Sequence, residues 1–431
     1  MNLVYVQSRA SGLPCAMAPS PTSSLWPCQA HPPTAAADRV VLVRGQASTV
    51  YDNRGRAYLD APASLWFCNV GHGRRELAEA AAAQMTTLET FNNFGRYATA
   101  PTLELADRLA PLLPMPEAKV FFTSGGGDGI DTAAKLAQWY WAAVGRPAKR
   151  TIVTRELAYH GLHGWGTSIT GIEANTEAVG RPISSTIRVP THDLDFLEAL
   201  LAERSDEIAA FFTEPVIGTG GVVPPQPGYL AAARELCRRH DVLWVSDEVV
   251  TGFGRTGTMF ASAGYGIEPD MMVVAKGITS GYVPLGAVAV GPRVAEPFWS
   301  SDPSVVFRHG LTYSGHATAC AVALAHLDLL EREDLVARVA ALEPVLDDAL
   351  EPLRRHPLVR EVRGPVGLMA GVELTDPAVG AWIERQALEA GVLTRVLGGR
   401  TLQVSPPFVI EEEQLRRIAG TWLELLDRAP G

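Results

Sequence analysis

Residues 271–287 read MMVVAKGITSGYVPLGA, and this stretch decides how the rest of the chain is interpreted. The run MMVVA is typical of a strand buried on both faces of a sheet, and Lys276 follows it at once. A lysine at the end of a buried strand is costly to desolvate unless it has a partner or a chemical task. One such task is an imine with an aldehyde cofactor, which needs an unprotonated amine. The alternative is that Lys276 reaches solvent.

Six further runs have the composition of strands: KVFFT, RTIVT, TIRVP, AAFFTE, VLWVSDE and GAVAVG. Helical periodicity separates several of them, at residues 128–143, 194–203 and 229–240. This βαβ alternation predicts an α/β fold with a mainly parallel seven-stranded sheet that is flanked by helices. GAVAVG follows Lys276 too closely for a crossover helix, so we expect one antiparallel strand.

The two ends of the chain differ from this central pattern. Residues 1–38 are rich in Pro, Ser and Ala and read as a tail. Two β-rich runs in residues 39–75 flank the turn DNRG and predict a hairpin, and helices are expected at 74–87 and 101–113. A helical region follows from 315 to about 355, and then an α+β pattern. We predict a large domain at 76–325 and a small α+β domain built from 39–75 and 326–431.

Composition excludes several classes of function. The 431 residues are 47% hydrophobic and 19% charged, with a net charge of −10, which argues against nucleic acid and anionic membranes as main partners. Five scattered cysteines suggest a reducing compartment, and no signal peptide or membrane-spanning segment is recognisable. We therefore expect a cytoplasmic protein, and we predict no metal site.

Charged residues follow three of the predicted strands: Glu214, Asp247 and Lys276. The carboxyl ends of parallel strands meet at one edge of a sheet, where ligands bind, so these residues predict a charged crevice. A structural ion-pair network is the alternative. The loop TSGGG opens the helix at 128–143, and backbone amides at Gly126 and Gly127 could bind a phosphate there. Such turns are also common without a ligand.

Two further loops carry groups suited to a flat, anionic ligand. In AYHGLHGWG, Tyr159 could stack on a ring, although an aromatic residue in a surface loop is equally ordinary. In FRHGLTYSGHA, Thr312 could bind a phosphate or carboxylate, or could be a simple helix N-cap.

In combination these motifs are far more specific. The chain resembles the fold-type I enzymes that use pyridoxal 5′-phosphate (PLP), and within them the class III aminotransferases, in particular the ω-amino acid and amine transaminases. The resemblance covers the chain from Val40 to its end. It rests on VFFTSGGGDGIDTAAKLA, YHG, TEPVIGTGG, DEVVTGFGRTG, AKGITSGYVPLGA, HGLTYSGHA and SPPF.

The resemblance implies a role for each matching residue around the cofactor. Lys276 would form the internal aldimine and move a proton to and from the substrate, and Asp247 would keep the pyridine nitrogen protonated, so that the ring accepts electrons. The other cofactor-binding positions are Gly126, Gly127, Tyr159, His160, Glu214, Val249 and Thr312. In this family the residue at Thr312 usually serves the neighbouring subunit, so a homodimer or larger homo-oligomer with shared sites is implied.

For the substrate, the resemblance implies contacts with Trp66 and Tyr159 and a carboxylate-binding role for Arg395, whose guanidinium can grip a carboxylate bidentately. A surface arginine on a strand is the alternative for Arg395. Two positions depart from the family pattern. Gly127 stands where a serine is usual, and Val250 stands where many relatives have glutamine.

The expected function is transfer of an amino group from an amine or amino acid to a ketone or aldehyde, through the aldimine and pyridoxamine forms of PLP. An aminomutase on the same scaffold is an alternative, since it keeps the amine within one molecule. A PLP-binding sensor without catalysis is another, but Lys276 and Asp247 are both retained and no DNA-binding segment is recognisable. The identity of donor and acceptor does not follow from the sequence.

Overall fold

Seven strands form one sheet in a computed structural model that describes residues 23–430. The spatial order is β4-β10-β9-β8-β7-β5-β6. β10 runs antiparallel to both of its neighbours, β4 and β9, whereas the pairs among β9, β8, β7, β5 and β6 are parallel. The predicted mainly parallel sheet with one antiparallel strand is therefore confirmed. Its strands are β4 Lys119–Thr123, β5 Thr151–Arg155, β6 Thr186–Val189, β7 Ile208–Thr213, β8 Leu243–Asp247, β9 Met271–Val274 and β10 Gly286–Val290.

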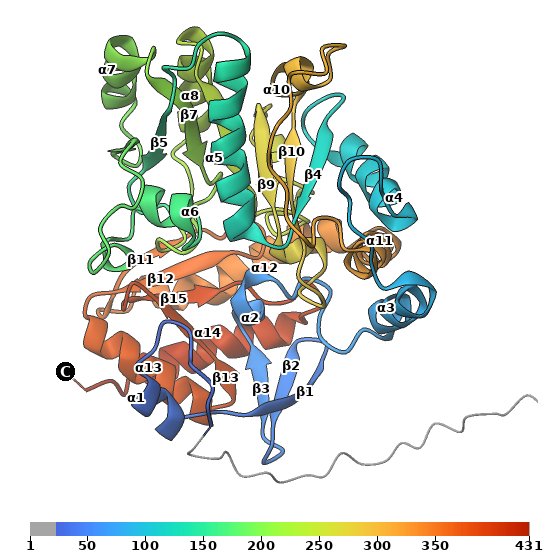
Figure 1. Ribbon diagram of the computed structural model, residues 1–431. Helices are drawn as coiled ribbons and strands as arrows, with labels where there is room; N and C mark the ends of the chain where they lie inside the picture. Colours follow the sequence, from blue (N-terminus) through green and yellow to red (C-terminus); the bar gives the residue numbers. More distant parts are fainter. Residues whose placement is uncertain (1–22, 431) are drawn as a thin grey trace, which may run out of the picture.

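Helices cover both faces of this sheet because its central strands are apolar on both sides. Val245 and Val273 belong to the core that packs on α5, whereas Phe211 and Trp244 belong to the core under α8. Figure 1 shows these helices around the sheet. The helices of this part are α5 Gly126–Ala143, α6 Gly164–Ile169, α7 Leu194–Arg204, α8 Tyr229–Arg239, α9 Ala261–Gly264 and α10 Pro292–Ala295.

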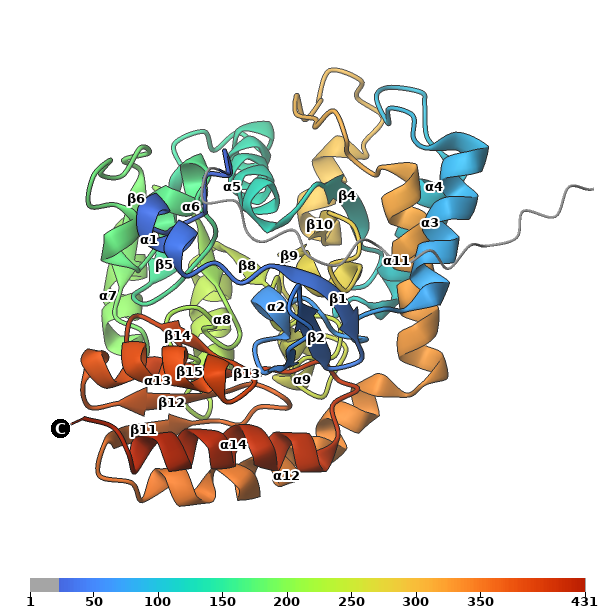
Figure 2. The same ribbon diagram turned by 90° about the horizontal axis from the view of Figure 1, so that it is seen from below.

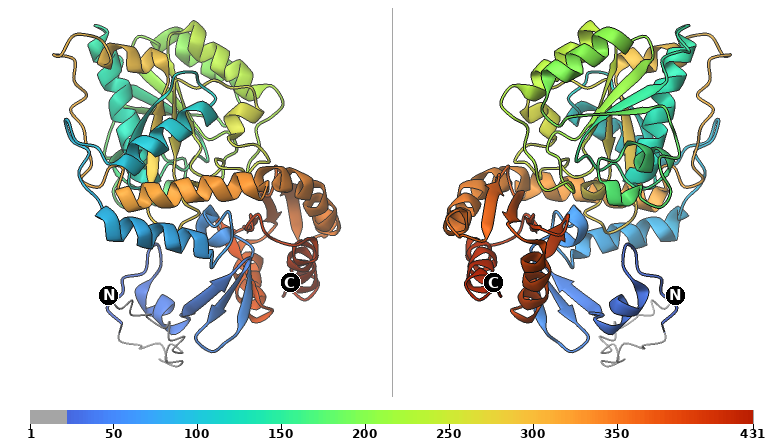
Figure 3. Two further views of the ribbon diagram at one scale, coloured as in Figure 1. Left: turned by 90° about the vertical axis from the view of Figure 1, so that its right-hand side faces the viewer. Right: turned by 90° about the vertical axis from the view of Figure 1, so that its left-hand side faces the viewer.

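Three helices form a separate layer along the edge of the sheet that ends in β4. Helix α11 (Ala317–Arg332) lies between α3 (Arg75–Leu88) and α4 (Ala100–Leu109), as Figure 3 shows. The helical region expected from 315 to about 355 is two helices, because Asp334 adopts a left-handed backbone (φ 48°) between α11 and α12 (Leu335–Arg354). No helix in residues 23–430 is long and apolar enough to cross a membrane.

Strands from both ends of the chain build the remaining part, below the large sheet in Figure 1. β13 pairs in parallel with β3, so the C-terminal segment completes the N-terminal sheet, and the DNRG hairpin joins β2 to β3. The first sheet has β1 Leu42–Gln46, β2 Thr49–Asp52, β3 Ala57–Asp60 and β13 Val392–Leu393. The second has β11 Val359–Arg363, β12 Ala370–Leu374, β15 Thr401–Val404 and β14 Arg395–Leu397.

The remaining helices are α1 Pro32–Ala37, α2 Ala63–Trp66, α13 Pro377–Glu389 and α14 Glu412–Leu426. These elements confirm the α/β fold with a small α+β part from both termini. The predicted tail lies outside the described residues up to residue 22, and α1 falls in its remainder. The domain boundaries at 39, 76 and 326 remain our proposal.

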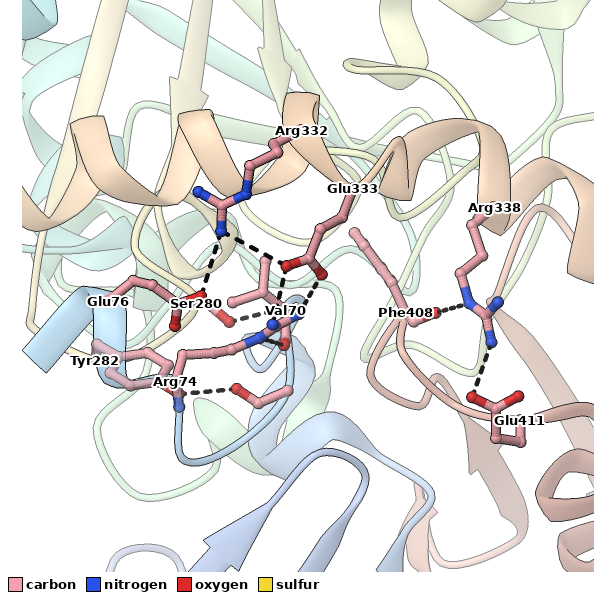
Figure 4. A network of polar contacts seen from close by, with 11 residues as sticks. Val70, Arg74, Glu76, Ser280, Tyr282, Arg332, Glu333, Arg338, Phe408 and Glu411 are labelled. Carbon is pink, nitrogen blue, oxygen red and sulfur yellow. Dashed lines mark hydrogen bonds and ion pairs between the residues drawn. The ribbon is translucent and has the colours of Figure 1, made fainter.

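A polar network joins the segment after α2 to the loop that follows Lys276 (Figure 4). The amide of Val70 donates to Ser280 Oγ (3.0 Å), and the Tyr282 hydroxyl accepts from the Arg74 amide (2.6 Å) and donates to the Gly71 carbonyl (2.9 Å). The Arg74 guanidinium also pairs with the Glu333 carboxylate at the end of α11. The position of the Lys276 loop therefore depends on contacts with the N-terminal part of the chain.

Replacing Tyr282 by phenylalanine should lower the free energy of unfolding by about 1–2 kcal/mol, because one backbone donor and one backbone acceptor lose their partner. The difference can be measured by urea denaturation of the two proteins. Tyr51→Phe is the matched control, because the Tyr51 hydroxyl makes no hydrogen bond to any described residue. Equal denaturation midpoints for Tyr282→Phe and wild type would contradict this account of the network.

Candidate active site

Three adjacent strands of the large sheet end at one edge, and a cavity of about 360 Å³ lies there. β7, β8 and β9 are buried along their whole length and lead into Glu214, Asp247 and Lys276. Eight of the predicted site residues line the cavity: Gly126, Gly127, Tyr159, His160, Glu214, Asp247, Val249 and Lys276. The strand ends thus deliver their charged groups to one place, as the sheet topology requires.

The half-buried Lys276 has two unusual features. Its backbone is left-handed (φ 47°), a conformation that costs a residue with a side chain about 1–3 kcal/mol and is typical of functional sites. Its amine makes no hydrogen bond or ion pair with any residue between 23 and 430. Burial lowers the pKa of Lys276 to about 8, although Asp247 and Glu214 oppose this shift. The amine is therefore partly unprotonated near neutral pH.

Asp247 is held in one orientation by its neighbours. It is 4% exposed, and its Oδ2 lies 2.7 Å from Nδ1 of the buried His160, while Oδ1 accepts the Val249 amide at 3.0 Å. A carboxylate can only accept, so Nδ1 of His160 carries the proton of this bond. On the other side of the ring, Nε2 lies 3.2 Å from Thr154 Oγ1. His160 therefore orients Asp247, a function that the sequence did not reveal.

The glycine-rich loop forms a cradle at the start of α5. A Cβ atom at Gly126 would lie 3.0 Å from a methyl carbon of Val249, so a side chain at this position would displace Val249 from the cavity wall. At Gly127 a Cβ would lie 3.4 Å from the ring of His163. Because glycine has no side chain, this position offers a ligand only its backbone groups. The N-terminus of this 18-residue helix faces the cavity and suits a phosphate.

Glu214 fixes the loop that carries Tyr159. Its carboxylate accepts the Tyr159 amide and the Gly218 amide, each at 2.9 Å, and the buried Arg155 guanidinium donates to its carbonyl. Burial raises the pKa of Glu214 despite these bonds. Tyr159 is thereby held against the cavity, where its ring can cover one face of a flat ligand.

Three of the predicted site residues do not line the cavity. Trp66 is 2% exposed and packs with Val250 and Leu397, whereas the neighbouring Phe67 reaches the cavity wall. Arg395 is half-buried beside the cavity, with Nη1 3.2 Å from Gln403 Oε1. Thr312 is exposed in the loop before α11.

Several lining residues were not predicted, including Phe67, Val250 and Thr279. Val250 and Thr279 each lie within a motif that carried the resemblance, and Val250 was also noted as a departure from the family pattern. Phe67 lies outside these motifs but directly follows Trp66, which was expected to contact the substrate. A motif does not reveal which of two adjacent side chains points inward, so the choice between Trp66 and Phe67 needed the fold.

Comparison with known proteins gives a consistent assignment. The family profile of class-III aminotransferases matches residues 32–425. A probable aminotransferase of Mycobacterium tuberculosis is 42% identical over 402 residues, which cover 86% of this chain and 85% of that protein. A putrescine–pyruvate aminotransferase of Pseudomonas aeruginosa is 36% identical, and 90% of each chain is covered.

Among solved structures, an ω-transaminase from Pseudomonas jessenii in complex with PMP superimposes with a TM-score of 0.91. That structure is 32% identical in sequence, and the match covers 96% of this chain and 98% of the other. The chain therefore belongs to the class III aminotransferases, a family of PLP-dependent transaminases of fold type I.

Proposed function

We propose that this aminotransferase binds PLP at Lys276 and transfers the amino group of a small amine or ω-amino acid to a 2-oxo acid of the pyruvate type. The observation that carries the proposal is the Lys276 amine, which is unpartnered among the described residues and opens onto the same cavity as Asp247. A relative named as a putrescine–pyruvate aminotransferase supports this choice of donor and acceptor. Arg395, whose charge acts on Lys276, supports an acceptor with a carboxylate.

PLP, when bound, would supply an electron sink for the electrons released when a C–H bond of the substrate breaks. Lys276 holds the cofactor and moves a proton at its Nζ to and from that carbon. Asp247, oriented by His160, keeps a proton on the pyridine nitrogen. The amides of Gly126 and Gly127 would bind the phosphate, and Val249 and Tyr159 would hold the ring between them.

On the substrate side, we assign Phe67 and Val250 to the apolar wall, and Trp66 supports this wall by packing with Val250. We assign Arg395 to the carboxylate of the substrate. Glu214 positions Tyr159 through its backbone amide. The location we propose is the cytoplasm. The cysteines at positions 28, 68, 237 and 320 are free, which is compatible with that reducing compartment.

We also propose a homodimer in which Thr312 serves the partner's site. Large apolar side chains are exposed around the Thr312 loop, and the loop before α4 contacts this loop (Figure 2). These side chains are Met85, Leu88, Phe91, Phe94, Tyr97 and Tyr313. A patch of this kind is typical of a protein interface. A solution mass of one chain by light scattering would contradict the dimer.

The function is tested by following the visible absorbance of bound PLP. A donor such as putrescine or β-alanine should remove the band, and pyruvate should restore it, because the amino group has moved to a second molecule. With an aminomutase the band would return without pyruvate, because the amino group stays within one molecule. Lys276→Ala should lack the band and react at least ~10²–10⁴-fold more slowly. Lys119→Ala is the control, because Lys119 begins β4 whereas the cavity lies beyond the other end of that strand. Near-normal turnover of Lys276→Ala would contradict the proposal.

The lowered pKa of Lys276 predicts how PLP uptake depends on pH. Only the unprotonated amine attacks the aldehyde, so its fraction should rise roughly tenfold between pH 7 and pH 9 for a pKa of about 8. Above pH 9 the rate should level off. Stopped-flow mixing of the apo-protein with PLP measures this rate. A rate that continues to climb through pH 10.5 would show that the amine has the ordinary lysine pKa.

A further inference from the structure

Arg395 and Gln403 face each other across the β14–β15 pair. They are direct partners in the register of this antiparallel ladder, so their side chains lie on the same face of the sheet. Nη1 of Arg395 donates to Gln403 Oε1 at 3.2 Å. Gln403 is 0% exposed, and a buried amide is costly unless both of its ends are hydrogen-bonded.

The other end of the Gln403 amide is bound as well. Its Nε2 donates to Ser405 Oγ at 2.7 Å, and Ser405 Oγ donates to the carbonyl of Pro62 at 3.3 Å. A carbonyl only accepts and a guanidinium only donates, so both ends of this chain of hydrogen bonds are fixed in direction. The Gln403 amide can therefore present only its oxygen to Arg395.

The chain of hydrogen bonds connects two elements of the substrate side. Pro62 immediately precedes α2, which contains Trp66, and Trp66 packs with Leu397 of β14. The positive charge of Arg395 acts on two residues that line the cavity. It adds to the effect of burial in lowering the pKa of Lys276. It also lowers the pKa of Tyr159, against the larger rise that burial causes there. The carboxylate of Glu384 on α13 also attracts Arg395, so the guanidinium has an alternative partner on that helix.

We propose that Gln403 is a positioning residue that holds Arg395 beside the cavity and thereby favours substrates with a carboxylate. This inference rests on the proposed function of Arg395. Without the Gln403 oxygen, the guanidinium loses a buried acceptor and turns towards Glu384. Binding of a carboxylate then has to restore the inward position first, and its apparent affinity falls. A carboxylate-free substrate makes no use of Arg395 and is unaffected.

The test is the comparison of pyruvate with propanal as acceptor for the PLP-loaded holoenzyme. Gln403→Leu should raise the KM for pyruvate roughly tenfold, as expected for a lost hydrogen bond to a charged group, with little change in kcat or in the KM for propanal. Ser405→Ala should shift the KM for pyruvate in the same direction by less. If Gln403→Leu does not fold, the KM of Ser405→Ala for pyruvate tests the inference in its place.

Two further variants separate the possible outcomes. Thr401→Val is the matched control, because Thr401 lies on the same face of β15 and is buried with a bond to Arg363. It should leave both KM values unchanged. An unchanged KM for pyruvate in Gln403→Leu or Ser405→Ala, alongside a raised KM in Arg395→Ala, would overturn the inference and leave the proposed function intact. If the KM for pyruvate is unchanged in Arg395→Ala as well, Arg395 does not bind the substrate carboxylate. Both that proposed role and the inference about Gln403 are then wrong.

Discussion

The Lys276 amine has no partner among residues 23–430, and this is the constraint on which the rest of the site depends. Moving an ammonium group out of water is unfavourable, so burial favours the neutral amine of Lys276 and lowers its pKa to about 8. The left-handed backbone at Lys276 adds strain. Both costs must be offset by the surrounding structure, which includes the buried strands β7, β8 and β9 and the polar contacts of Ser280 and Tyr282.

The two ends of the chain contribute to the site through separate contacts. The N-terminal segment holds the loop after Lys276 through Val70 and Gly71. The C-terminal segment places Arg395 opposite Gln403, and the chain of hydrogen bonds from Gln403 ends at Pro62. Because β13 also pairs with β3, these segments fold against each other. The Lys276 loop and the surroundings of Arg395 therefore depend on the same assembly of the two ends.

Much of this arrangement could be predicted from the sequence, because its signals are local. Glu214, Asp247 and Lys276 each follow an apolar run directly, and the rules of parallel sheets bring such strand ends together. The seven strands of the large sheet were recognisable for the same reason. The break at Asp334 was not, because a single residue with a left-handed backbone leaves no periodic signal.

Other features depend on three-dimensional neighbours and could not be predicted. The bond between His160 and Asp247 joins residues that are 87 positions apart. The partnership of Arg395 and Gln403 needs the register of two strands, and the inward position of Phe67 rather than Trp66 needs the path of the chain around α2. No sequence pattern specifies these relations, because each depends on how separate elements pack.

We propose Lys276 as the residue that binds PLP, and the small number of lysines in the chain allows a direct measurement. The sequence contains four lysines, at positions 119, 135, 149 and 276. Lys149 is an internal comparison, because burial also lowers its pKa to about 8. Its amine differs from that of Lys276 in donating a hydrogen bond to the Ser205 carbonyl at 2.6 Å. Borohydride reduction of the PLP-loaded protein, followed by peptide mass spectrometry, should find the pyridoxyl group on Lys276 alone. A pyridoxyl group on Lys149, or none on Lys276, would contradict the account.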